Sequence, residues 1–203
     1  MAKIKHTKNE LKTQREALMR YQRFLPTLEL KKSQLVTEIR RRMREIDLLE
    51  ENVQQVAAEI FEWVDVMAEE VDLKALLKIR AIQTEEGNIA GIDIMVFKNV
   101  EFEDIPYDYF TTPLWVDRAL EILREQISRR IKIEILQKQV DILLEEMRIT
   151  IQRINLFEKV KIPEARENIR VIQIFLGDAQ TAEVVRGKIA KAKIQSKQEL
   201  AGV

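Results

Sequence analysis

Hydrophobic positions recur along the first third of the chain at alternating steps of three and four residues. Such a seven-residue repeat places one narrow apolar seam on a helix and predicts a left-handed supercoil with a second helix. A large seam residue contributes about 1.5–3 kcal/mol only when it is buried, so this helix requires a partner. The seam positions are Leu11, Gln14, Leu18, Tyr21, Leu25, Leu28, Lys32, Leu35, Ile39, Arg42, Ile46, Leu49, Val53, Val56, Ile60, Trp63 and Met67.

The same pattern indicates where this helix begins and ends. Thr7 with Glu10 three residues later has the spacing of a capping box, which predicts a helix start at this point. The helix is expected to run to about Val71. Pro26 lies inside it, and because the seam continues in phase across the proline, we expect a kink at residues 24–25 and not an end.

After residue 72 the seam lapses and β-branched residues dominate. Two such runs, Ile79–Thr84 and Ile89–Phe97, flank the turn-like segment Glu85–Asn88 and predict a β-hairpin. Gly91 indicates a bulge or a close backbone approach, and residues 100–113 are expected to form an irregular return. The hairpin is either a capping loop on the coiled coil or a contact tip for a partner. The candidate contact residues are Gly87, Ile89, Gly91 and Ile92.

A second apolar stripe supplies the missing partner helix. Thr112 and Pro113 have the residue types of an N-cap and a first helical position. The short excursion between the helices makes them antiparallel. We expect facing residue numbers to sum to about 184 to 190, which would place Pro26 level with Pro163. The stripe comprises Leu120, Leu123, Ile127, Ile131, Leu136, Val140, Leu143, Met147, Ile151 and Ile154.

The second helix is expected to resume after Pro163 and to reach about Ser196. By the same numbering, residues beyond Gly177 have no first helix beside them, so this end is a single overhanging helix. A lone amphipathic helix is marginal in water unless another surface surrounds it. The candidate contact residues here are Val184, Val185, Arg186, Lys188, Ile189 and Lys191.

Composition agrees with a chain made mainly of long helices. Of the 203 residues 33% are charged and 46% hydrophobic, with only five glycines and four prolines. The expected fold is dominated by α-helix: a long antiparallel two-helix coiled coil with a small β-hairpin excursion. Its expected parts are an N-terminal helix over 1–72, a hairpin and tip over 73–113, and a C-terminal helix with its overhang over 114–203.

Charge and cysteine content exclude several classes of function. With 34 basic and 34 acidic residues the formal net charge is zero, so no overall field favours nucleic acid or an anionic membrane. The basic clusters Lys31–Lys32 and Arg40–Arg42 are followed by acidic residues, as on a solvated coiled-coil face. The absence of cysteine, of an apolar leader and of any long apolar run favours a cytoplasmic protein without membrane insertion.

No residue pattern predicts catalysis, a cofactor or a metal. The single histidine, His6, lies near the terminus and cannot form a histidine-based site alone. Gly187 and Lys188 lack the upstream glycine and the following Ser or Thr of a phosphate-binding loop. The acidic pairs Glu69–Glu70 and Glu145–Glu146 are adjacent on a helix, so their side chains project differently.

Five segments in order resemble the D-subunit family of V-type and archaeal-type rotary ATPases, over nearly the whole chain. None is a catalytic fingerprint, but generic coiled coils do not combine them. The segments are Lys8–Leu11, Phe24–Leu28 with Leu30–Lys32, Asn88–Ile92, Asn155–Lys159 through Ile162–Pro163, and Ile169–Asp178 with Val184–Lys191.

The resemblance implies a central rotor shaft without a catalytic role of its own. In this family the coiled coil stands inside the ring of catalytic A and B subunits, and its lower part binds the small F subunit and docks on the C subunit. Rotation of the shaft couples ATP synthesis or hydrolysis to hydrogen ion or sodium transport. The implied location is cytoplasmic and peripheral to the membrane. The alternative from another class is a holding chaperone of the prefoldin type, whose helices would end together without an overhang.

Overall fold

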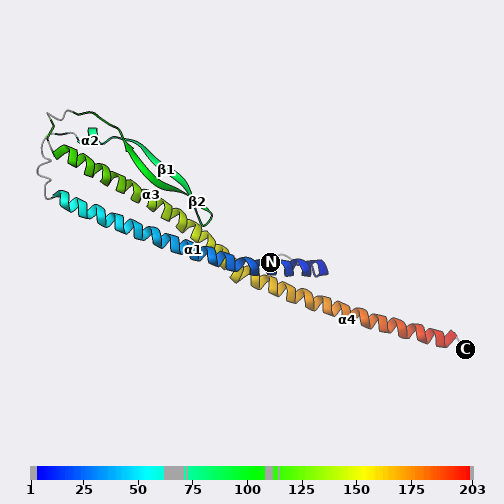
Figure 1. Cartoon of the computed structure of the whole chain (residues 1–203). Coiled ribbons are helices and arrows are strands. Elements are labelled where there is room, and N and C mark those ends of the chain that lie inside the picture. The colour runs from blue at the N-terminus through cyan, green and yellow to red at the C-terminus, as the bar shows by residue number, and fades with distance from the viewer. Residues whose placement is uncertain (1–3, 62–70, 72, 108–111, 114, 202–203) are drawn as a thin grey trace. The chain divides into compact units, whose positions relative to one another are not determined.

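The computed structural model describes residues 4–61, 71, 73–107, 112–113 and 115–201 (Figure 1). Two long helical stretches are separated along the chain by a two-stranded antiparallel sheet, so the predicted fold class is confirmed. The chain divides into two compact units, one formed by residues 31–150 and one by residues 1–30 with 151–203, and each is described by itself. The elements are α1 (Lys8–Phe61), α2 (Leu73–Leu76), β1 (Ile79–Ile89), β2 (Ile92–Phe102), α3 (Trp115–Leu156), the π-helix η2 (Phe157–Lys161) and α4 (Ile162–Ala201).

Helix α1 begins where the capping pattern predicts. The Thr7 hydroxyl accepts a hydrogen bond from the Glu10 backbone N–H at 3.2 Å, and this bond satisfies one donor of the first turn. The Glu10 carboxylate accepts instead from Gln14 at 2.8 Å, so only one half of the capping box forms. The helix continues across Pro26, as predicted. The predicted continuation to Val71 lies largely outside the described residues.

The apolar seam is the face that α1 buries. Each seam position from Leu11 to Ile60 is buried or half-buried except Lys32, which is exposed. The side chain of the neighbouring Lys31 forms an ion pair with Glu146 of α3 instead. Trp63 and Met67 lie outside the described residues. The heptad pattern therefore identifies the packed face correctly.

In the unit of residues 31–150, α1 and α3 are antiparallel and share one apolar core. Lys31 Nζ lies 2.8 Å from Glu146 Oε1, and Lys132 Nζ lies 2.8 Å from Glu45 Oε1. Residue numbers therefore rise along one helix as they fall along the other. The core consists of Leu35, Ile39, Ile46, Ile133, Leu136, Val140 and Leu143.

The predicted register between these helices is wrong. The expected sum of facing numbers places residues 153–159 opposite Lys31, whereas Lys31 pairs with Glu146. The displacement is about one heptad or more. A shift of one heptad brings apolar positions opposite apolar positions again, so the hydrophobic pattern alone does not choose between the two alignments.

The β-hairpin forms, but its turn lies further along the chain than predicted. Residues 85–88 belong to β1, where Gly87 pairs with Ile94, and the chain reverses at Ala90 and Gly91. The register shifts of the ladder fall near Ile79 and Gln83, not at Gly91. Residues 100–102, expected in the irregular return, extend β2.

Strand β2 lies along α3 and runs in the opposite direction (Figure 1). The side-chain amide of Gln139 donates a hydrogen bond to the Met95 carbonyl, and the Arg124 guanidinium lies 5.7 Å from the centre of the Phe102 ring. Seven strand residues cover about 23 Å, and the fifteen helix residues between these two contacts cover about 22 Å. The two lengths match, so β2 and α3 run alongside each other between these two contacts. Ile94 and Val100 are the buried residues of β2.

In the unit of residues 1–30 with 151–203, the start of α1 packs against η2 and α4. The rings of Tyr21 and Phe157 are 5.1 Å apart, and those of His6 and Phe175 are 4.8 Å apart. Glu164, next to Pro163, lines a small cavity together with Ala17 and Tyr21. Pro163 therefore does not stand level with Pro26, and that prediction is wrong for the same reason of register.

A widened helical turn precedes Pro163. The Ile162 N–H bonds to the Phe157 carbonyl five residues earlier, which closes a π-turn. A proline has no N–H to donate and its ring crowds the carbonyl four residues before it. The π-turn relieves this conflict without ending the helix. Helices α3, η2 and α4 therefore follow one another without a break, where the sequence predicts that the helix resumes after Pro163.

Candidate interaction surfaces

The tip of the hairpin is a tight, well-braced turn. Ala90 and Gly91 both have positive φ angles, 53° and 80°, as in a type I′ turn. The Asn88 side chain braces the turn, because its Oδ1 accepts the Gly91 N–H at 3.0 Å and its Nδ2 donates to Asp93 at 2.7 Å. The tip therefore has one defined conformation that depends on an unusual backbone at Ala90.

The predicted contact residues of the hairpin face inward more than outward. Ile89 and Ile92 are half-buried and pack, with Ala90, against the helical core cluster. A Cβ atom added at Gly87 would lie 2.8 Å from the Val96 side chain, so this glycine admits a close neighbour within the sheet. Gly91 has no atom within 4 Å of such a Cβ and is needed for its φ angle. The tip is thus fastened to the helices along their length and does not cap their end.

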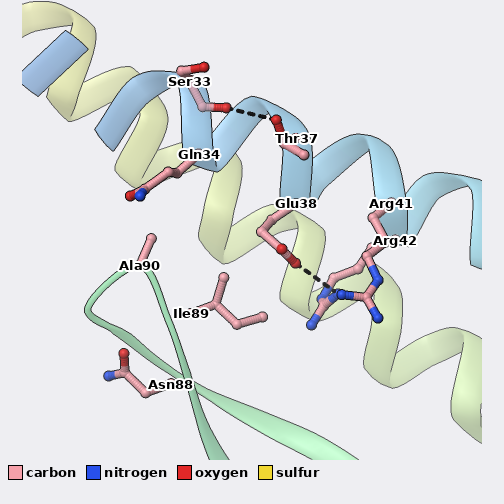
Figure 2. A pocket seen from close by; sticks show the side chains of 9 residues that line it. All are labelled: Ser33, Gln34, Thr37, Glu38, Arg41, Arg42, Asn88, Ile89 and Ala90. Carbon is pink, nitrogen blue, oxygen red and sulfur yellow. Dashed lines mark hydrogen bonds and ion pairs between the residues drawn. The ribbon is translucent and has the colours of Figure 1, made fainter. Parts of the chain in front are cut away.

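A polar groove lies between the hairpin tip and α1 (Figure 2). Its volume is about 540 Å³. Asn88, Ile89 and Ala90 form one wall. The other wall consists of Ser33, Gln34, Thr37, Glu38, Arg41 and Arg42 of α1. Sequence reasoning missed this groove, since its walls are about fifty residues apart; the only local signal is the Arg40–Arg42 cluster.

Two arginines and one glutamate set the charge of this groove. Arg42 occupies a seam position of the heptad, and its side chain is 13% exposed. Its Nη1 lies 3.5 Å from Glu38 Oε2, the upper limit for a hydrogen bond, and its Nε is buried without a partner. Arg41 is exposed. The groove therefore carries one net positive charge and donor capacity that the described residues do not satisfy.

The overhang predicted at the C-terminal end is present. Every residue from Gly177 to Ser196 is exposed, which is the pattern of a helix with no partner along this stretch. Val184, Val185 and Ile189 are 59%, 49% and 52% exposed. The remaining candidates on this helix, Arg186, Lys188 and Lys191, are exposed as well.

The candidate chemistry is sparse across the described residues. No group of three or more His, Cys, Asp or Glu side chains is arranged to hold a metal ion within those ranges. Glu145 pairs with Arg148 while Glu146 pairs with Lys31, so these two carboxylates diverge as predicted. Glu69 and Glu70 lie outside the described residues. Gly187 and Lys188 lie within the continuous helix α4 and form no loop.

One carboxyl group is perturbed on the surface of α4. The hydrogen bonds from the Arg170 guanidinium, at 2.7 and 2.9 Å, hold the pKa of Glu167 below its ordinary value. The same contact raises the pKa of Arg170. Both groups are one turn apart on an exposed helix face, as in an ordinary helix-stabilising ion pair. None of the helices described is long and apolar enough to cross a membrane.

These features define a coiled-coil protein with paired helices, a hairpin packed along them and an exposed helical extension. Its candidate sites are surfaces for contact with other proteins. Comparison with known proteins identifies its family. The model of the family described as the D subunit of ATP synthase matches residues 10–192, and the chain belongs to this family.

Relatives named as the D subunit of V-type ATP synthase match over nearly their whole length. The protein from Borreliella burgdorferi is 45% identical over 97% of this chain and 98% of its own. Those from Chlamydia abortus and Chlamydia caviae are 31% and 32% identical, each over 98% of this chain and 97% of the relative. These matches agree with the resemblance found in the sequence and give no support to the prefoldin alternative.

Proposed function

We propose that this chain is the central rotor stalk subunit of a V-type rotary ATPase. In this role it couples ATP synthesis or hydrolysis in a ring of A and B subunits to proton or sodium translocation. The observation that carries the proposal is the 45% identity to the D subunit of a V-type ATP synthase over 97% of the chain and 98% of the relative. As a stalk the chain holds no catalytic residue of its own, and it lies on the cytoplasmic face, peripheral to the membrane.

The exposed end of α4 supports insertion into a protein sleeve. Exposed valine and isoleucine side chains on a lone helix gain about 25 cal/mol for each Å² of apolar surface that a surrounding protein covers. Val184, Val185 and Ile189 supply that surface, and the cations beside them supply charge that a ring interior can complement. We assign this end to the bore of the A/B ring.

We assign the unit of residues 31–150, which carries the hairpin, to contacts with the remaining partner subunits. Its helices and the hairpin present a polar groove and exposed apolar residues, among them Met43 and Met95, at 52% and 54% exposure. We propose that this unit meets the small F subunit of the stalk and the C subunit, which links the stalk to the membrane rotor ring. Gly87, Ile89, Gly91 and Ile92 shape this region through the backbone and packing of the tip.

Reconstitution tests the proposal directly. The chain is co-expressed with the A, B, F and C subunits from the same genome, and the purified assembly is tethered by the ring with a bead on this chain. We expect stoichiometric co-purification and ATP-driven rotation of the bead. An assembly that contains this chain and hydrolyses ATP while the bead stays stationary would contradict the stalk assignment. Suppression of client aggregation by the isolated chain would favour the chaperone instead.

A further inference from the structure

The groove between α1 and the hairpin tip is roomy, and its lining is mixed. Its volume of about 540 Å³ far exceeds that of a small inorganic anion, and one wall carries the apolar side chains Ile89 and Ala90. The opposite wall carries hydroxyl, amide and guanidinium groups. Such a mixed lining suits an amino-acid side chain that has an apolar stem and a charged end.

The charges of the groove select the sign of that end. Arg41 and Arg42 stand against the single carboxylate of Glu38, so one added negative charge makes the groove neutral. Figure 2 shows Glu38 and Arg42 joined by their ion pair, with Arg41 beside them on the same helix. Guanidinium groups bind carboxylates through two parallel hydrogen bonds, which a long single contact with Glu38 does not provide.

The incomplete pairing of Arg42 also favours the binding of an added carboxylate. Buried N–H groups in folded proteins nearly always have a partner. Arg42 Nε is buried without one, and the Glu38 carboxylate reaches Nη1 only at 3.5 Å. Nothing else among the described residues pairs with this guanidinium. A second carboxylate entering the groove would meet the exposed Arg41 and the end of the Arg42 guanidinium, because Nε itself is covered by protein atoms.

We infer that this groove receives an acidic segment of a partner subunit, with an Asp or Glu carboxylate bound to Arg41 and Arg42 on the α1 wall. The braced turn at Asn88–Gly91 holds the hairpin wall of the groove in place before the partner arrives, so little ordering is needed on binding. The inference rests on the proposed function in one respect, namely that the chain works inside a multi-subunit assembly.

Zero-length crosslinking in the intact assembly tests this contact. Arg41→Lys keeps the charge and introduces an amine that a carbodiimide joins only to a carboxylate in direct contact. We expect an amide bond between the introduced amine and an Asp or Glu of another subunit, identified by mass spectrometry. The matched control is Arg44→Lys, because Arg44 is exposed on the same helix but does not line the groove.

Charge reversal measures the strength of the contact. Hydrogen bonds to charged groups contribute about 1.5–3 kcal/mol, so Arg41→Glu is expected to weaken retention of the partner about tenfold to hundredfold. Arg44→Glu is expected to change it much less. Circular dichroism checks that both variants keep their helices, which the exposure of both side chains favours.

The outcomes separate this inference from the proposed function. Co-purification of the unaltered chain with the ring, together with a crosslink only to Glu38 or Glu45 of the same chain, would overturn the inference alone. Equal crosslinking at positions 41 and 44 would also overturn it, since the groove would then have no special role. Failure of the unaltered chain to join the assembly would contradict the proposed function.

Discussion

Two glycines show how one residue type serves opposite purposes in this chain. Gly91 has a φ of 80° and open space around it, so its need for glycine is purely conformational. Gly177 also has open space, but it lies within α4, where glycine only increases the entropy of the unfolded chain. The same substitution to alanine should therefore act in opposite directions at the two positions.

Gly91→Ala is expected to destabilise the hairpin by about 1–2 kcal/mol, because a Cβ is disfavoured at this φ. Gly177→Ala is expected to stabilise α4 locally by about 0.5–1 kcal/mol. Hydrogen exchange of the backbone amides, read separately over residues 79–102 and 170–190, measures both. Equal protection of the hairpin in the wild type and in Gly91→Ala would show that the tip does not need this backbone conformation.

At the scale of elements, the hairpin and α3 are joined through a buried polar residue. Gln139 is 3% exposed, and its amide donates to the Met95 carbonyl while its Oε1 has no partner. A buried side-chain amide gives little net stability when its nitrogen has a hydrogen-bond partner and its oxygen has none, because the unpaired oxygen offsets part of the hydrogen bond. We therefore expect Gln139 to position the strand more than it stabilises the fold.

Gln139→Leu is expected to change the free energy of unfolding by less than about 1 kcal/mol, since it removes both the bond and the unpaired oxygen. Exchange of the β2 amides should nevertheless become about fivefold to tenfold faster, because the strand loses its side-chain hydrogen bond to α3. The exposed neighbour in Gln137→Leu serves as the control. A large loss of global stability with unchanged exchange in β2 would contradict the positioning role.

At the scale of the whole molecule, the exposed end of α4 separates folding from function. Residues 177–196 bury nothing within their own unit, so their removal should leave the rest of the fold in place. In the proposed stalk they enter the A/B ring, so their removal should weaken seating and lower the efficiency of coupling. The two effects are measured independently.

Truncation after Leu176 is expected to shift the thermal midpoint of the remaining helices only slightly. Binding to the ring and ATP-driven rotation should fall clearly. Circular dichroism and single-molecule rotation provide the two measurements. Full coupling after truncation would contradict insertion of this end, and loss of all helical structure would show that the extension helps to hold the coiled coil. Reversal of Arg186, Lys188 and Lys191 to Glu is the milder variant, and added salt should reduce its effect.

The sequence by itself determined the helices, the face they bury and the overhang. Burial of a seam depends only on the spacing of apolar residues along one helix, and that spacing is local. Leu35, Ile39 and Ile46 are buried as their positions predict, and residues beyond Gly177 are exposed as predicted. Short segments that stand in order along the chain gave the resemblance to the D-subunit family, and the match to the family model confirmed it.

Only the tertiary structure decided the register, the turn and the groove. A heptad seam repeats, so alignments that differ by one heptad bury similar surfaces. The ion pairs Lys31–Glu146 and Glu45–Lys132 identify the actual alignment, and they are known only from the tertiary structure. The turn falls at Ala90 and Gly91 and not at Glu85–Asn88, because β1 extends through Glu85–Asn88 and places Ile89 and Ile92 against the helical core. The groove exists because that packing brings Asn88, Ile89 and Ala90 beside α1, and no local pattern contains both of its walls.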